Sequence, residues 1–391
     1  MQFLFIFILV IASVTLPADE GMWEPYQMSE LKNEVRQAGF RRNINSISSP
    51  FEYPMNAIVS LGGCSASFVS PNGLIATNYH CIEGSYLQYN SSQENNLFET
   101  GFVARSLDEE KRSAPGARVY ITLSSSDITE KVLAGISDTT ENSQRANIIE
   151  ANRKNIINAC ETSAEIECRV RSFFSGETFK LEKVRVIKDV RLVYAPPASI
   201  GEYGGEIDNW MYPRHTGDFA LLRAYVSADG TSQEFNTANV PYASKNYLKI
   251  SARGVDEGDF VMVLGYPGRT NRLLTMNEID YDLTVGFQGV VDYLEQGIAL
   301  IDEHTNQEDG SALKYRGTKS GYENYYKKIS GQIDGAENFQ LLQYEQANWN
   351  KFLTFVENEL SSEDQEYLAR LLSLIDTCLL YTSDAADDWF C

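Results

Sequence analysis

Two segments of the sequence contain residue types that could transfer a proton. The first, GGCSASFVSPNGLIATNYHC, ends with His80 next to Cys81. A histidine side chain can act as a general base near neutral pH. The second, GEYGGEIDNWMYPRHTGDFALLRAYV, places Asp218 directly before an apolar run. A buried carboxylate at the start of a strand can accept the imidazole N–H, fix its tautomer and stabilise the imidazolium. Together, His80 and Asp218 predict acid–base chemistry that activates a nucleophile.

Each of these residues also has an ordinary structural explanation. A single histidine is more often structural than catalytic, and an aspartate before a strand is often a turn residue or a cap. Arg214 and His215 lie close to Asp218 in the sequence. His215 lacks a spacing that would pair it with a nucleophile, and we interpret both residues as structural. The catalytic interpretation therefore requires a fold that brings His80 and Asp218 together.

A β-hairpin is expected to position His80. The runs AIVSLGG, SASFVS and GLIAT are short, and Gly, Pro and Asn interrupt them, as is typical of strands joined by tight turns. A disulfide between Cys64 and Cys81 would hold the residue next to His80 against the neighbouring strand. On the chain-entropy model it would stabilise the fold by roughly 3 kcal/mol in an oxidising compartment.

The rest of the chain alternates between β and helical patterns. Further strands are expected in ARVYITLSS, KVRVIKDVRLVYAP, DFALLRAYVS and GDFVMVLGYPG, which together indicate an antiparallel barrel or sandwich. Residues 127–160 have apolar residues at helical spacing, so a helical excursion interrupts the β region. From about Met276, stretches such as FQLLQYEQANWNKFLTFVENEL predict a separate helical region.

The N-terminus and the cysteines point to an exported protein. Residues 3–12, FLFIFILVIA, are apolar and are followed by SVTLPA, which predicts a secretory signal cleaved near Ala18, although no Lys or Arg precedes the run. In an exported chain the six cysteines suggest disulfides, and their spacing adds Cys160–Cys168 to the first pair. Zinc is the competing interpretation. We expect no metal, because CxxC spacing is missing and the three histidines are scattered.

The amino-acid composition restricts which kinds of molecule the protein is expected to bind. The chain has 391 residues with 43% apolar content, which is ordinary for a globular protein of two or three domains. Its 54 acidic residues against 33 basic ones give a net charge of −21, which argues against a nucleic-acid partner. The apolar N-terminal run is too short to span a bilayer, so we expect no membrane association.

These segments, taken together, resemble the bacterial serine dipeptidyl peptidases of peptidase family forty-six, in particular the dipeptidyl-peptidase seven and eleven group. The resemblance rests on DEGMW, FVSPNGLIATNYHC, DNWMYPRHTGDF and GYPGRT, and it begins at Asp19. It implies a mainly β plus α fold, a chymotrypsin-like double β-barrel with an inserted helical domain. It also implies a His, Asp and Ser triad whose first two members are His80 and Asp218. Asn209 and Trp210 match the pair that binds the free N-terminus of the substrate.

The resemblance divides the chain into four parts. Residues 1–18 are the signal peptide, and residues 19–275 are the N-terminal part of the peptidase domain, with its second barrel incomplete. Residues 276–377 begin the inserted helical domain. Residues 378–391, CLLYTSDAADDWFC, look like the translation of a sequencing adapter, so we expect the natural reading frame to leave the protein near Thr377. A genuine acidic tail is the alternative.

The chain departs from the family pattern at the nucleophile. A serine peptidase needs a Gly-x-Ser-Gly-type segment whose backbone N–H groups form the oxyanion hole, and the sequence has none. Ser65, Ser67 and Ser70 lie on the hairpin before His80, and Ser330 is in a helical stretch without flanking glycines. We therefore expect the nucleophile beyond residue 377 and expect the chain as written to be inactive.

The expected activity belongs to the complete protein. It is the release of dipeptides from oligopeptides with a free N-terminus, without a cofactor, in the periplasm or at the cell surface. Two alternatives stay open: a chymotrypsin-type endopeptidase, and a secreted, catalytically dead binding protein with the same fold. The oligomeric state is also open, with a homodimer among the options.

Overall fold

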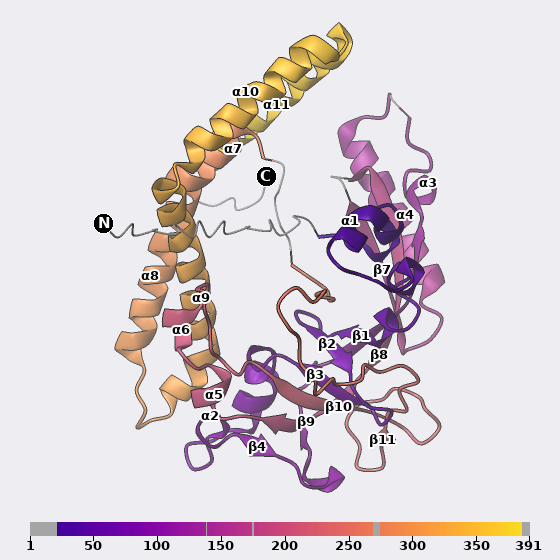
Figure 1. Cartoon of the computed structure of the whole chain (residues 1–391), viewed down its shortest axis with the longest axis vertical. Helices are drawn as coiled ribbons and strands as arrows, with labels where there is room; N and C mark the ends of the chain where they lie inside the picture. Colours follow the sequence, from indigo (N-terminus) through magenta and orange to yellow (C-terminus); the bar gives the residue numbers. More distant parts are fainter. Residues whose placement is uncertain (1–21, 138, 174–175, 269–273, 385–391) are drawn as a thin grey trace, which may run out of the picture.

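The computed structural model describes residues 22–137, 139–173, 176–268 and 274–384. The predicted signal peptide, Arg269 and the last seven residues lie outside this part, so they are not discussed further. Figure 1 shows one large sheet with helices around it and a long arm built from helices of the C-terminal region. Within the described ranges, no helix is both long enough and apolar enough to cross a bilayer.

Eleven strands form a single antiparallel sheet, in the spatial order β4-β9-β10-β3-β2-β1-β6-β8-β7, with β11 beside β10 and β5 beside β9. The strands are β1 Ile58–Ser60, β2 Ser65–Phe68, β3 Leu74–Thr77, β4 Phe102–Val103, β5 Lys111–Arg112, β6 Val119–Asp127, β7 Ile166–Phe173, β8 Thr178–Ile187, β9 Asp189–Ala195, β10 Ala220–Val226 and β11 Val240–Pro241. The predicted hairpin before His80 is confirmed, because β2 and β3 pair with Phe68 opposite Ile75.

The helices fall into two groups. Those around the sheet are α1 Lys32–Gln37, α2 Leu97–Thr100, α3 Thr129–Val132, α4 Asn142–Cys160, α5 Ala198–Gly201 and α6 Gly205–Asp208. Those of the arm are α7 Met276–Tyr281, α8 Phe287–His304, α9 Ser311–Asn338, α10 Leu341–Glu359 and α11 Ser362–Asp384. Helices α3 and α4 lie in the helical excursion expected at 127–160, and α4 packs on β7. In Figure 1, α9 runs beside α5 and α6, where the arm meets the rest of the molecule.

The main core lies along the centre of the sheet. Val59, Ile75, Val119, Leu192 and Leu222 are fully buried there. Alternate residues of β2 and β3 point into it, as the two-residue period of a strand requires. This burial stabilises the central strands because it removes apolar surface from water.

The strand predicted over residues 258–268 is wrong. No strand is assigned there, and Val261 and Val263 are 66% and 99% exposed. A strand forms only when a neighbour pairs with its backbone, and within the described ranges this segment has no such partner. Its Tyr266 instead lies over the sheet, where its N–H donates to Ser65 Oγ at 2.7 Å. Conversely, β7 forms in a segment where we predicted no strand.

The hairpin turn provides a test of the fold. Gly73 has φ +69, and a Cβ there would lie 2.8 Å from the carbonyl oxygen of Ala224 and 2.9 Å from that of Tyr242. Gly73→Ala should lower the free energy of unfolding by at least about 1–2 kcal/mol, because a left-handed backbone is costly for an L-residue. Gly63→Ala is the control, since nothing lies within 4 Å of its added methyl group. Equal urea midpoints for the two variants would contradict this prediction.

Candidate active site

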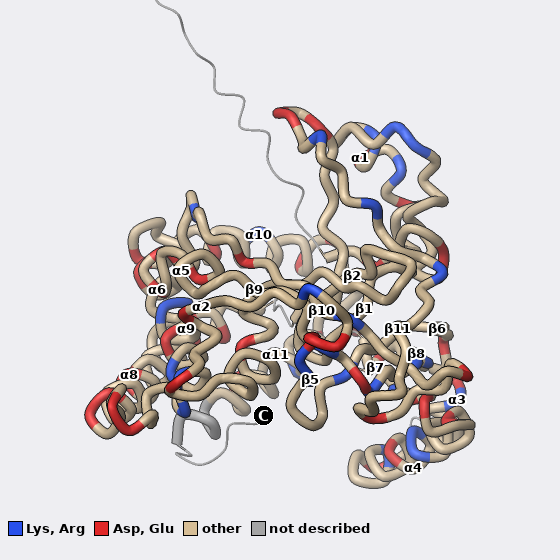
Figure 2. Tube along the Cα trace, turned by 90° about the horizontal axis from the view of Figure 1, so that it is seen from below, with Lys and Arg blue, Asp and Glu red and all other residues tan. Residues whose placement is uncertain are grey.

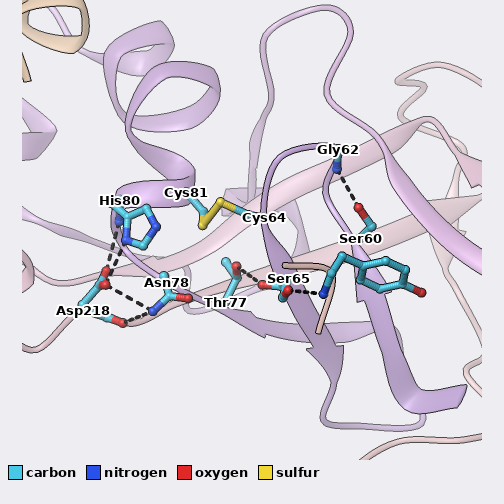
Figure 3. The surroundings of a disulfide bond; sticks show 10 residues. Ser60, Gly62, Cys64, Ser65, Thr77, Asn78, His80, Cys81 and Asp218 are labelled. Atoms are coloured by element: carbon cyan, nitrogen blue, oxygen red, sulfur yellow. Dashed lines mark hydrogen bonds and ion pairs between the residues drawn. A yellow bond between two sulfur atoms is a disulfide. The ribbon is translucent and has the colours of Figure 1, made fainter. Parts of the chain in front are cut away.

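His80 and Asp218 lie next to each other in the structure. Strand β10 pairs with β3 so that Ala220 is opposite Thr77, which places the residue just before β10 beside the residues just after β3. His80 Nδ1 lies 2.9 Å from Asp218 Oδ2, and the His80 backbone N–H donates to Asp218 Oδ1 at 3.1 Å. Asn78 Nδ2 donates to the same carboxylate at 3.1 Å (Figure 3). The carboxylate thus holds both the backbone and the ring of His80.

The surroundings of Asp218 keep it ionised. Burial opposes its ionisation, but the hydrogen bonds and charge of His80 together hold the pKa of Asp218 below its ordinary value. Its side chain is 24% exposed, whereas that of His80 is 62% exposed. The result is a fixed carboxylate behind an accessible imidazole, which is the arrangement a general base needs.

The backbone around His80 is fixed on both sides. Cys64 and Cys81 form the predicted disulfide, which ties the residue after His80 to the start of β2 (Figure 3). Tyr79, the residue before it, is fully buried, and its ring packs so closely on Gly201 that an added Cβ would lie 2.5 Å from it. The other predicted bond, Cys160–Cys168, joins the end of α4 to β7, away from His80.

One group of side chains has metal-ligand types. In the described part of the chain, Cys64, His80 and Cys81 offer ligand atoms that all lie within 4.8 Å of one another. Both sulfurs are joined in the disulfide, so neither is available as the thiolate that zinc binds. The two cysteines are therefore better explained as a disulfide that supports the backbone next to His80.

Asn209 and Trp210 follow helix α6 and lie in a strained, well-bonded turn. Trp210 has φ +58, a left-handed conformation that is uncommon for a large side chain and is frequent at functional sites. Asn209 Oδ1 accepts from Arg214 Nη1 at 2.8 Å and from the Trp210 backbone N–H at 3.1 Å. Asn209 Nδ2 donates to Glu206 Oε2 at 2.8 Å. Arg214, which we interpreted as structural, therefore contacts the predicted amine-binding residue directly.

Asn324 on helix α9 completes this turn, and sequence reasoning missed it. Its Oδ1 accepts from Asn209 Nδ2 at 2.8 Å and from Trp210 Nε1 at 3.1 Å. More than 100 residues separate Asn324 from this pair, and no local pattern marks it. The contact arises only because α9 packs beside α6.

A cavity of about 1440 Å³ joins the two groups of residues. Its wall includes His80 and Asp218 at one place and Asn209, Trp210 and Asn324 at another. Acidic side chains outnumber basic ones in this wall. The acidic residues are Glu83, Glu99, Glu202, Glu206, Asp218, Asp302 and Glu323, and the basic ones are Arg214, Arg316 and Lys319, apart from His80. Figure 2 shows acidic residues along α8 and near α5 and α6, at the same side of the molecule. Such a cavity favours a cationic group such as a peptide α-ammonium.

Comparison with known proteins gives one consistent family. The model of the Peptidase S46 family matches residues 18–388. An Asp/Glu-specific dipeptidyl-peptidase from Shewanella putrefaciens is 40% identical over 89% of this chain and 47% of its own length. Dipeptidyl-peptidase 7 from Capnocytophaga gingivalis is 31% identical over 88% of this chain and 48% of its own length. The chain thus spans about half the length of these curated relatives.

Solved structures agree with the predicted fold class. The crystal structure of Porphyromonas endodontalis DPP11 in complex with the dipeptide Arg-Glu matches with a TM-score of 0.77 and 28% identity, over 88% of this chain and 50% of the other. The same protein in complex with Arg-Asp matches with a TM-score of 0.77 and 27% identity, over 94% of this chain and 53% of the other. The large antiparallel sheet with a helical C-terminal region is therefore a chymotrypsin-like fold with a helical domain.

The contact between His80 and Asp218 can be tested by NMR. Asp218 accepts hydrogen bonds at both oxygens, so the native His80 ring should carry its proton on Nδ1 when neutral. In Asp218→Asn the oxygen can still accept from the His80 backbone, and the new NH₂ group then faces Nδ1 and favours the opposite tautomer. Two-bond ¹⁵N–¹H spectra of histidine-labelled protein distinguish the two forms. Asp334→Asn, exposed on α9, should leave the tautomer unchanged, and an unchanged tautomer in Asp218→Asn would contradict the prediction.

Proposed function

Because this chain belongs to the Peptidase S46 family, we propose that the complete protein is a serine-type dipeptidyl aminopeptidase that acts on oligopeptides with a free N-terminus. The observation that carries this proposal is the shared cavity, which contains both an imidazole–carboxylate pair and a separate polar turn suited to an ammonium group. The names of the relatives support the same activity.

In this proposal His80 is the general base. It takes the proton of a serine hydroxyl as the serine attacks the peptide carbonyl, and it later gives that proton to the leaving amine. Asp218 keeps the ring in the productive tautomer and stabilises the imidazolium. The serine and its oxyanion hole belong to the part of the complete protein that these residues do not include.

In this proposal the turn at Asn209 and Trp210 binds the substrate's N-terminus and so sets which peptide bond is cleaved. A peptide α-amine has a pKa of about 7.7–8.0, so it is mostly cationic at pH 7. Glu206, which already accepts from Asn209, supplies a carboxylate beside the turn, and Trp210 supplies an aromatic face. An ammonium held there fixes how far the chain reaches toward His80, so cleavage falls after a set number of residues.

The second residue of the substrate is proposed to be acidic. Of the two relatives described above, the more similar one is named as Asp/Glu-specific, and the other is a dipeptidyl-peptidase 7. We also propose that the protein is exported, as its N-terminal segment and the disulfides Cys64–Cys81 and Cys160–Cys168 suggest. Whether it works as a homodimer is a question for gel filtration of the complete protein.

Peptides with free and blocked amines test the reaction type. The complete protein should release dipeptides from peptides with a free N-terminus and lose at least about 100-fold in kcat/KM on N-acetylated forms, because acetylation removes the charge that Glu206 attracts. Peptides with Asp or Leu at the second position separate the two specificities. Equal cleavage of free and acetylated peptides would support the endopeptidase, and no cleavage of either would support the binding protein.

Asn324 provides a second test. Asn324→Ala removes the acceptor that holds both Asn209 and Trp210, a loss of about 1–3 kcal/mol or roughly 5- to 150-fold. The loss should appear mainly as a higher KM for peptides with a free amine, with a smaller change in kcat. Asn338→Ala, exposed at the end of the same helix, is the matched control. An unchanged KM in Asn324→Ala would refute this role.

A further inference from the structure

Four polar side chains, two of them buried and two half-buried, meet where the His80 turn contacts helix α9. Tyr79 precedes the 3-10 turn His80–Ile82, and Glu83 begins the π-helical turn Glu83–Gln88 that follows it. Glu202 is the C-cap that follows helix α5, and Arg316 comes from the first turns of α9. Arg316 Nη2 donates to Glu202 Oε2. This acid junction, as we call Tyr79, Glu83, Glu202 and Arg316, connects the base of the proposed active site to the helical arm.

The acid junction has too few hydrogen bonds if both glutamates are ionised. Glu202 Oε1 is buried, and no donor among the described residues reaches it. Tyr79 Oη and Arg316 Nε are also buried without a partner there. Glu83 is only 9% exposed. A buried carboxylate oxygen without a donor is costly, on the order of 1–3 kcal/mol or more. A proton on Glu83 removes this cost, because it turns Glu83 into a donor for the neighbouring Glu202.

The charges that face Glu83 agree with a protonated state. Burial is the largest cause that raises the pKa of Glu83, to about 8, and the charge and hydrogen bond of Glu202 add to it. Arg316 lowers this pKa and Asp218 raises it, while His80 lies three residues earlier on the same turn. Two carboxyl groups that share one proton carry one negative charge, which Arg316 balances.

Helix α9 carries the contacts that depend on this junction. At its N-terminal end, Gln88 Nε2 donates to the backbone carbonyl of Lys314 at 2.6 Å. Arg316 also lies over the ring of Phe98, 4.4 Å from its centre. Asn324 and Lys327, eight and eleven residues further on, lie on the same face of the helix, since 3.6 residues make a turn. Lys327 donates to the carbonyl of Glu206 at 2.6 Å.

We propose that Glu83 and Glu202 hold one proton between them, and that this acid pair with Arg316 positions α9 so that Asn324 reaches Asn209 and Trp210. Glu83, Glu202 and Arg316 are thus positioning residues for the amine-binding turn. The consequence for catalysis rests on the proposed function, but the shared proton and the docking of α9 do not. Loss of the proton leaves two negative charges against one guanidinium in a partly buried place, which weakens the docking.

Proton linkage predicts in which direction, and over which pH range, the docking of α9 changes. The docked state binds a proton at Glu83 up to about pH 8, whereas an undocked, solvated glutamate releases it near pH 4.5. Docking should therefore be strongest below about pH 4.5, fall as pH rises toward about 8, and level off above that. The docking constant can fall by at most about tenfold per pH unit, because a single proton is involved.

Hydrogen–deuterium exchange of the complete protein measures this docking without reference to catalysis. Protection factors for residues 316–327, corrected for the intrinsic pH dependence of exchange, should fall between pH 5.5 and 8 and then level off. In Glu83→Gln the amide donates to Glu202 at every pH, so protection should be independent of pH in this range. Glu130→Gln makes the same substitution at an exposed site on α3 and should keep the slope of the unaltered protein.

Each outcome of the exchange measurement either supports or overturns the proposal. A flat profile in the unaltered protein, an unchanged slope in Glu83→Gln, or a slope that Glu130→Gln also removes would each overturn it. Should Glu83→Gln not fold, infrared spectra of the unaltered protein decide. A protonated-carboxyl C=O band that disappears near pH 8 together with the protection of α9 supports the proposal, and its absence at pH 7 overturns it. Protection can change in this way even if the protein cleaves no peptide, so the two proposals fail separately.

Discussion

The antiparallel pairing of β3 with β10 is the constraint on which the site depends. This pairing brings together residues about 140 positions apart, and Asp218 and His80 lie just beyond its end. Ile75 and Leu222, which are directly paired and fully buried, hold the register. A slip of one residue would move one strand by about 3.3 Å and turn its apolar side chains toward the other face. The 2.9 Å contact between imidazole and carboxylate would then be lost.

The strands and the disulfides could be predicted from local sequence because turn residues and cysteine spacing are local signals. The hairpin before His80 and the bond between Cys64 and Cys81 are examples. The segment at 258–268 has an equally good strand pattern, but a pattern does not supply a pairing partner. Strand β7 was missed although Ile166, Cys168 and Val170 alternate with charged residues, which is the two-residue period of a half-buried strand.

The candidate site was predictable only in part, for a related reason. His80, Asp218, Asn209 and Trp210 lie in segments with recognisable motifs, and the structure places all four in one cavity wall. Asn324 is on helix α9, whose sequence does not indicate which residue faces the turn after α6. Its role follows from tertiary packing of α9 on α6, which local periodicity does not encode. The sheet therefore positions His80 and Asp218, while the helical arm shapes the surroundings of Asn209 and Trp210.

Asn209 already has all the neighbours that its amide can accommodate. Its oxygen accepts two hydrogen bonds, from Arg214 and from the Trp210 backbone, and its nitrogen donates two, to Glu206 and Asn324. A cationic group therefore cannot add a fifth hydrogen bond to the Asn209 amide. A cation that bonds to the Asn209 oxygen must displace the Arg214 guanidinium, whereas a cation held by Glu206 leaves that contact in place.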